Sequence, residues 1–104
     1  MVLAAQKMEQ LRGLIPGVDL NEGGTLDTSV AGFADYLDLA GNILGAGGGV
    51  PPGTVYVRRW SVAAMPSKPD LLVIQALVTT PAPEAAVDAA SLVTLRSRRA
   101  PWGR

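Results

Sequence analysis

The segment TVYVRRWSVAAMPSKPDLLVIQALVTT, residues 54–80, predicts two long β-strands and sets the fold class of the chain. Residues 54–65 are β-branched and aromatic, which is typical of a strand. Residues 66–70 contain two prolines and predict a five-residue turn. Residues 71–80 are largely apolar on both alternating faces, as expected for a central strand covered on both sides. The segment therefore predicts an antiparallel hairpin.

The alternation of the first strand changes at Arg58 and Arg59. Val57 before this pair and Trp60 after it would lie on opposite faces of a regular strand. A β-bulge at the pair would turn both toward the core. Trp60 could also stack on a nucleic-acid base or a sugar beside the two arginines, but a single aromatic residue in a strand is more typical of a core position.

Outward from the hairpin, a third strand is predicted at residues 91–99, after a connector at 81–90 with room for a helical turn. Residues 16–53 form a long connection rich in Gly, Asp, Asn and Thr. Within it, residues 32–42 fit either a short strand or one helical turn. Residues 100–104 are predicted to be a tail.

Residues 1–15 predict an amphipathic helix, because apolar side chains recur there at steps of three and four. The apolar stripe contains Val2, Leu3, Ala5, Met8, Leu11 and Ile15. The opposite face is polar and contains Gln6, Lys7, Glu9, Gln10 and Arg12. No capping residue precedes this stripe, so we expect the native helix to begin roughly 30 residues upstream, with an apolar run that spans a bilayer.

These elements predict one α+β domain over residues 1–104, with a truncated N-terminal helix packed on a three- to four-stranded antiparallel sheet. Cysteine and histidine are absent, which excludes thiol catalysis, the usual zinc sites and histidine acid–base chemistry. The Gly-rich run at 41–49 lacks the Gly-Lys-Ser/Thr of a phosphate loop. Asp35 and Asp38 could pair as acid and base or bind a metal, but solvated or capping roles are more typical. We therefore expect no enzyme and no cofactor.

The charge of the chain is balanced overall but unevenly distributed. Residues 1–50 carry six acidic and two basic side chains, a net charge of −4, and residues 51–104 carry the opposite excess. One hypothesis is therefore a small module that binds polyanions or nucleic acid through a basic strand face. That face would contain Arg58, Arg59, Arg96, Arg98 and Arg99, and it requires the strands at 54–65 and 91–99 to be neighbours.

The order of these elements, read with several short stretches, resembles the type IV pilin and pseudopilin superfamily. The likeness runs from residue 2 to about 99 and is closest to the PilV-like minor pilins and the I-type minor pseudopilins. The stretches that carry it are LAAQKMEQLR (3–12), DYLD (35–38), GN (41–42), YVRRWSV (56–62), LLVI (71–74) and LVTLRSR (92–98). The family's leader, cleavage site and apolar anchor are not in this sequence, and the lack of a C-terminal cysteine pair suits a minor subunit.

The resemblance implies a pilin-like roll and a non-enzymatic structural subunit of a type IV pilus or a type II secretion pseudopilus. It also implies an inner-membrane anchor, a periplasmic domain, and other pilin or pseudopilin subunits as partners. The N-terminal helix would carry assembly, with an interface at Gln6, Lys7, Gln10 and Arg12. The acidic and basic halves could then meet between neighbouring subunits.

Overall fold

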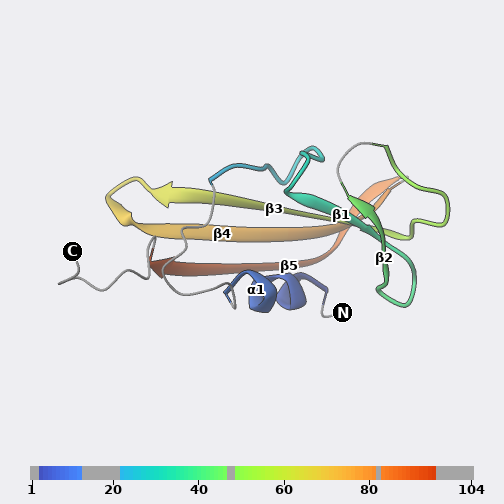
Figure 1. The fold of residues 1–104 in the computed structure, drawn as a ribbon, viewed down its shortest axis with the longest axis horizontal. Coiled ribbons are helices and arrows are strands. Elements are labelled where there is room, and N and C mark those ends of the chain that lie inside the picture. Colours follow the sequence, from blue (N-terminus) through green and yellow to red (C-terminus); the bar gives the residue numbers. More distant parts are fainter. Residues whose placement is uncertain (1–2, 13–21, 47–48, 82, 96–104) are drawn as a thin grey trace.

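Five antiparallel strands form one sheet, and a single described helix packs across one face of it (Figure 1). The computed structural model describes residues 3–12, 22–46, 49–81 and 83–95. The elements are α1 (Leu3–Arg12), β1 (Ala34–Leu37), β2 (Ile43–Ala46), β3 (Tyr56–Met65), β4 (Lys68–Pro81) and β5 (Glu84–Leu95), and the strand order is β2-β1-β3-β4-β5. The predicted α+β arrangement is confirmed, with five strands in place of three or four.

The hairpin of β3 and β4 lies at the centre of the sheet, as the sequence predicts. Its turn is shorter than expected, because β4 begins at Lys68 and leaves only Pro66 and Ser67 between the strands. The predicted connector at 81–90 is wrong, since β5 begins at Glu84 and pairs with β4 along its whole length. Alanine has a low strand propensity, so it is the pairing with β4 that fixes this segment as a strand.

The β-bulge predicted at Arg58 and Arg59 is wrong. The pairing of β3 with β4 runs in one register from Val57 to Ala64 and shifts only between Ala64 and Met65. Side chains of a regular strand alternate between faces, so Arg58 faces α1 with Trp60, and Arg59 lies on the other face with Val57. Both faces of the sheet are covered at this end. The side chains on each face are therefore buried without a bulge.

Two further strands come from the segment predicted as a long connection. Residues 32–42, for which strand and helical turn were both open, contain β1, and β2 forms a neighbouring edge of the sheet. The turn between them is organised by Asp38, whose Oδ1 accepts hydrogen bonds from the backbone N–H groups of Ala40 and Asn42, both at 2.9 Å. A short polar side chain that binds the backbone two residues on is a common way of fixing a turn.

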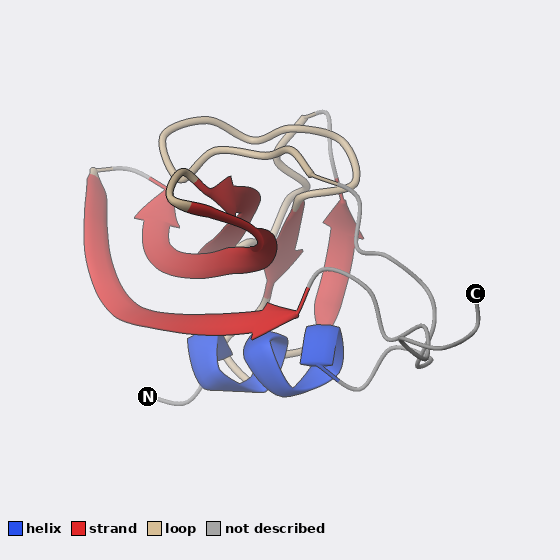
Figure 2. Ribbon diagram, turned by 90° about the vertical axis from the view of Figure 1, so that its left-hand side faces the viewer, coloured by secondary structure: helices blue, strands red, loops and turns tan. Residues whose placement is uncertain are grey.

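The core lies between α1 and the face of the sheet that it covers (Figure 2). Every second side chain of β4 from Leu72 to Val78 is fully buried on this face. The helix contributes Leu3, Ala4 and Met8. Leu3 and Met8 belong to the predicted stripe, so the helix packs by its apolar side chains onto the alternating apolar side chains of the sheet.

The opposite face is covered only in part. Near β1, Tyr36, Val57 and Thr79 are buried, and Arg59 donates hydrogen bonds to Ser29 Oγ and the Leu26 carbonyl of the loop before β1. Farther along β4, the side chain of Gln75 is exposed. The expectation that β4 is covered on both sides therefore holds at its C-terminal end and not along its whole length.

Candidate functional site

A buried ion pair joins two neighbouring strands beneath the helix. Asp35 of β1 and Arg58 of β3 are cross-strand partners, and each is only 4% exposed. Arg58 Nε and Nη2 donate to the two carboxylate oxygens of Asp35 at 2.9 and 3.0 Å. Arg58 Nη1 donates to the backbone carbonyl of Leu3 at 3.1 Å, which ties the sheet to the first turn of α1. A bidentate pair of this kind fixes both side chains in one orientation.

Lys7 completes the cluster from the helix. Its Nζ lies 3.2 Å from Asp35 Oδ2, donates to Gln10 Oε1 at 2.6 Å, and sits 4.0 Å from the centre of the Trp60 ring. Burial lowers the pKa of Lys7 and Arg58 lowers it further, while the Asp35 carboxylate acts in the opposite direction. The ammonium group is thus held by a carboxylate, an amide oxygen and an aromatic face.

The expectation that Lys7 lies on the exposed face of the helix is wrong, because it is only 5% exposed. The buried face of α1 contains Leu3, Ala4, Lys7 and Met8, with Leu11 packed against the core. Position 7 lies four residues from both Leu3 and Leu11, and this spacing could have placed it on the buried face. Ala5, which the sequence placed in the stripe, is exposed instead.

Asp88 of β5 binds the first turn of the helix from the other side. The backbone N–H of Ala4 donates to Asp88 Oδ2 at 2.9 Å. The first N–H groups of a helix have no partner within the helix, and a carboxylate there also interacts favourably with the helix dipole. The sequence gives no signal for this contact, because the two residues are separated by 84 positions.

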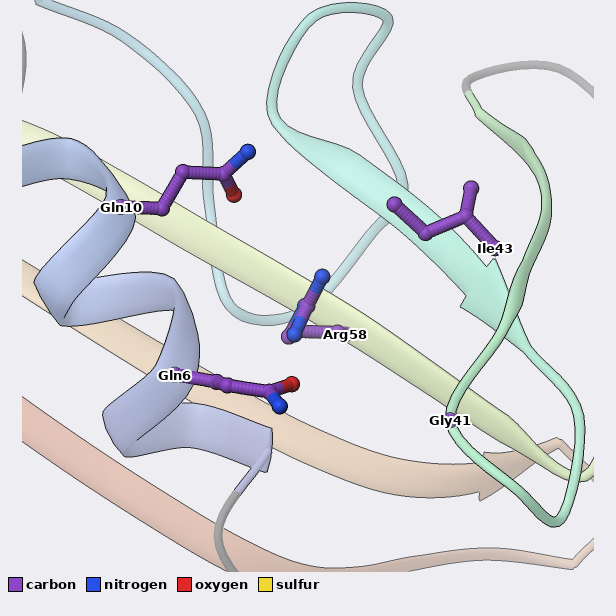
Figure 3. A pocket seen from close by; sticks show the side chains of 5 residues that line it. All are labelled: Gln6, Gln10, Gly41, Ile43 and Arg58. Atoms are coloured by element: carbon purple, nitrogen blue, oxygen red, sulfur yellow. The ribbon is translucent and has the colours of Figure 1, made fainter.

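A pocket of about 260 Å³ opens beside the buried ion pair. Figure 3 shows Gln6 and Gln10 of α1 on one side, Ile43 of β2 on the other, and Arg58 between them. Gly41, from the turn before β2, completes the lining. The pocket thus combines one buried guanidinium group, two carboxamides and an aliphatic wall.

The residues predicted for an assembly interface differ in their exposure to solvent. Gln6 and Gln10 are exposed on the flank of α1 that lines this pocket. Lys7 is buried, as described above. Arg12 ends the helix, and its side chain lies outside the described residues.

Arg58 and Arg59 do not form the basic strand face that the sequence suggested. Arg58 and Arg59 are both buried, on opposite faces of the sheet, and Arg59 Nη1 pairs with Glu84 Oε1 at 3.2 Å. Strands β3 and β5 are not neighbours, because β4 lies between them. The other expected members, Arg96, Arg98 and Arg99, lie outside the described residues. Two positive charges of the basic half are thus neutralised within the domain.

The remaining candidates take structural positions. Trp60 is in the core, in agreement with the interpretation preferred from the sequence. Asp35 and Asp38 do not face each other, since Asp35 pairs with Arg58 and Asp38 is bound within its own turn. Hydrogen bonds from Asn42 and its neighbours lower the pKa of Asp38. Across the described residues, no group of three or more acidic, histidine or cysteine side chains is arranged to hold a metal ion.

Comparison with family models, curated proteins and solved structures finds no match for this chain. In the part of the chain that the structure describes, no helix is long and apolar enough to cross a bilayer.

Proposed function

We propose that this chain is a non-enzymatic structural subunit, of the minor-pilin or minor-pseudopilin kind, in a type IV pilus or a type II secretion pseudopilus. The observation that carries the proposal is the two-sided helix. Leu3 and Met8 attach one side of α1 to the sheet, while Gln6 and Gln10 are exposed along its flank. A filament subunit that assembles through its first helix needs one side to hold its own domain and one side for its neighbours.

The order of elements supports the same proposal. An N-terminal helix packed on an antiparallel sheet is the arrangement that the resemblance implies, and we propose that this sheet is the roll of a pilin-like domain. In the cell, the domain would stand in the periplasm, joined to the inner membrane by an apolar helix that leads into α1. Other pilin or pseudopilin subunits would be its partners. An apolar helix of about 20 residues would supply most of the contact area in such a filament.

The contact residues of this proposal differ from those expected from sequence. Gln6 and Gln10 remain candidates for contacts with a neighbouring subunit. Lys7 pairs with Asp35 between α1 and the sheet, and at 5% exposure it has almost no surface that a partner could contact. Substitutions of Lys7 would therefore test the fold of the domain and not its assembly.

Cross-linking in cells can test the proposal directly, because the chain contains no cysteine of its own. Gln6→Cys or Gln10→Cys would place a single reactive thiol on the exposed flank of α1. We expect a bifunctional thiol reagent, added to cells that express either cysteine variant together with a cysteine-bearing pilin or pseudopilin partner, to give a cross-link between the two.

Two controls make this result specific. Ser67→Cys, in the exposed turn between β3 and β4, tests whether any surface thiol reacts in the same way. Cells that lack the assembly machinery should lose the cross-link from α1. A cross-link that persists without that machinery, or none from either position on α1, would contradict the proposal.

A further inference from the structure

The pocket beside α1 contains a guanidinium group whose hydrogen-bonding capacity is only partly used. Arg58 is 4% exposed, yet it lines the pocket. Its three hydrogen bonds, two to Asp35 and one to Leu3, engage three of the five N–H groups of arginine. Two N–H groups remain. The bidentate pair with Asp35 holds the guanidinium plane still, so these donors are fixed before any ligand arrives.

The charge around the pocket favours an anion. Asp35 supplies one negative charge to two cations, Arg58 and Lys7. Asp88 is the other acidic group bound to α1, but it is engaged by the Ala4 amide and does not line the pocket. Asp35, Arg58 and Lys7 together therefore sum to one positive charge, and Asp38, in the turn that contains Gly41, is already engaged by the backbone N–H groups of Ala40 and Asn42. The neighbouring Asp35 carboxylate disfavours a ligand with two negative charges, because like charges repel strongly away from bulk water.

The other residues that line the pocket indicate which kind of anion it can bind. Gln10 uses its oxygen to accept from Lys7, which leaves its NH₂ group as a donor, and Gln6 offers a second carboxamide (Figure 3). Ile43, which is 57% exposed, provides an aliphatic wall. The volume of about 260 Å³ is just below the range of typical ligand pockets. The remaining guanidinium N–H donors and the carboxamides, beside an apolar wall, suit a carboxylate that carries a short aliphatic group.

We propose that this pocket binds a small monocarboxylate, either a free acid or the carboxylate at the end of a polypeptide chain. Arg58 and the carboxamides of Gln6 and Gln10 would hold its oxygens, and its aliphatic part would lie against Ile43. This activity goes beyond filament assembly and does not rest on it. The bound carboxylate would link α1 to β2, because residues of both elements line the pocket. Arg58, which also lines it, comes from β3.

A titration followed by ¹H–¹⁵N NMR can test the proposal with sodium propionate as the probe, at constant ionic strength against sodium chloride. We expect saturable shifts of the Gln6 and Gln10 side-chain NH₂ signals and of Arg58 Nε–H. Chloride should produce none. Shifts that do not saturate, or equal shifts with chloride, would overturn the proposal.

A charge placed in the pocket provides the matched variant. Gln6→Glu should weaken propionate binding by at least about tenfold, because it adds a negative charge at the entrance. The same change at Gln75, an exposed glutamine of β4 that does not line this pocket, should leave binding unchanged. Thermal melts of both variants would verify that each is folded. Equal binding by the Gln6→Glu variant and the unchanged protein would overturn the proposal.

A second titration, with a peptide, distinguishes the end of a polypeptide chain from a free acid as the source of the carboxylate. The probe is acetyl-trialanine with a free C-terminal carboxylate, and its control is the same peptide with a C-terminal amide. Binding of the free peptide supports a chain end as the ligand, and binding of propionate alone supports a free acid. If the amidated peptide binds as well as the free one, the carboxylate is not what the pocket recognises and the proposal fails.

Discussion

At the scale of single residues, Asp35 is the counter-charge of two buried cations, Lys7 and Arg58. We predict that Asp35→Asn lowers the free energy of unfolding by about 3–5 kcal/mol, since it leaves Lys7 and Arg58 buried without a counter-charge. Asp27→Asn is the matched control, because Asp27 is exposed in the loop before β1. Urea unfolding of both variants checks the prediction. Equal stability of the two would mean that the cluster is solvated.

Lys7 gives the domain a predictable dependence on pH. Its pKa in the folded protein lies below the value of 10.5 for a free lysine side chain, so the unfolded chain binds this proton more tightly. The free energy of unfolding should therefore rise as pH increases through the folded pKa toward 10.5. Lys7→Met removes this titration while keeping a long aliphatic side chain.

Urea unfolding of the native protein and of the Lys7→Met variant tests this pH dependence. The quantity to follow is the difference between their free energies of unfolding, from pH 7 to about 10.5, where a free lysine titrates. Other groups titrate in both proteins and cancel in the difference. We expect the difference to grow in favour of the native protein as pH rises. A difference that shrinks would mean that attraction to Asp35 outweighs burial and raises the pKa of Lys7.

At the scale of elements, α1 depends on β5 for the start of its hydrogen bonding. The first turn of the helix contains no acidic residue of its own, and Asp88 occupies that role from the sheet. We predict that Asp88→Ala lowers the free energy of unfolding by about 1 kcal/mol, within the range measured for helix-capping residues. Asp70→Ala, in an exposed position of β4, should have little effect.

Hydrogen exchange would locate the effect of the Asp88 substitution. We expect faster exchange of the amides in α1, with β3 and β4 unchanged, because the lost hydrogen bond joins α1 to β5 and involves neither β3 nor β4. Uniform acceleration across the sheet would instead show that Asp88 supports the whole fold.

The elements differ in how well the sequence predicts them. Helix α1 and strand β3 follow from local patterns, the three- and four-residue steps from Met8 to Leu11 and Ile15 and the β-branched run around Val57. The start of β5 does not, because its alanines become a strand only by pairing with β4. The contact of Asp35 with Arg58 spans 23 positions and depends on the register of β1 against β3, which no local pattern encodes.

At the scale of the whole molecule, stability should be greatest in the centre of the sheet. Strand β4 pairs on both sides, with β3 and β5, and its Leu72 and Ile74 are fully buried. We predict that amides at 71–79 are the slowest to exchange and that those at 22–32 and 49–54 are among the fastest, because these loops have few paired amides. Equal protection of the loops and of β4 would contradict this.

The attachment of the helix has a mechanical consequence. Two neighbouring backbone groups in its first turn are held by different strands, the Leu3 carbonyl by Arg58 of β3 and the Ala4 amide by Asp88 of β5. A pull on the N-terminal end of α1 would load these two bonds first and in shear. The force would then pass into the strands on either side of β4, and the later turns of the helix would bear tension only after both bonds had ruptured.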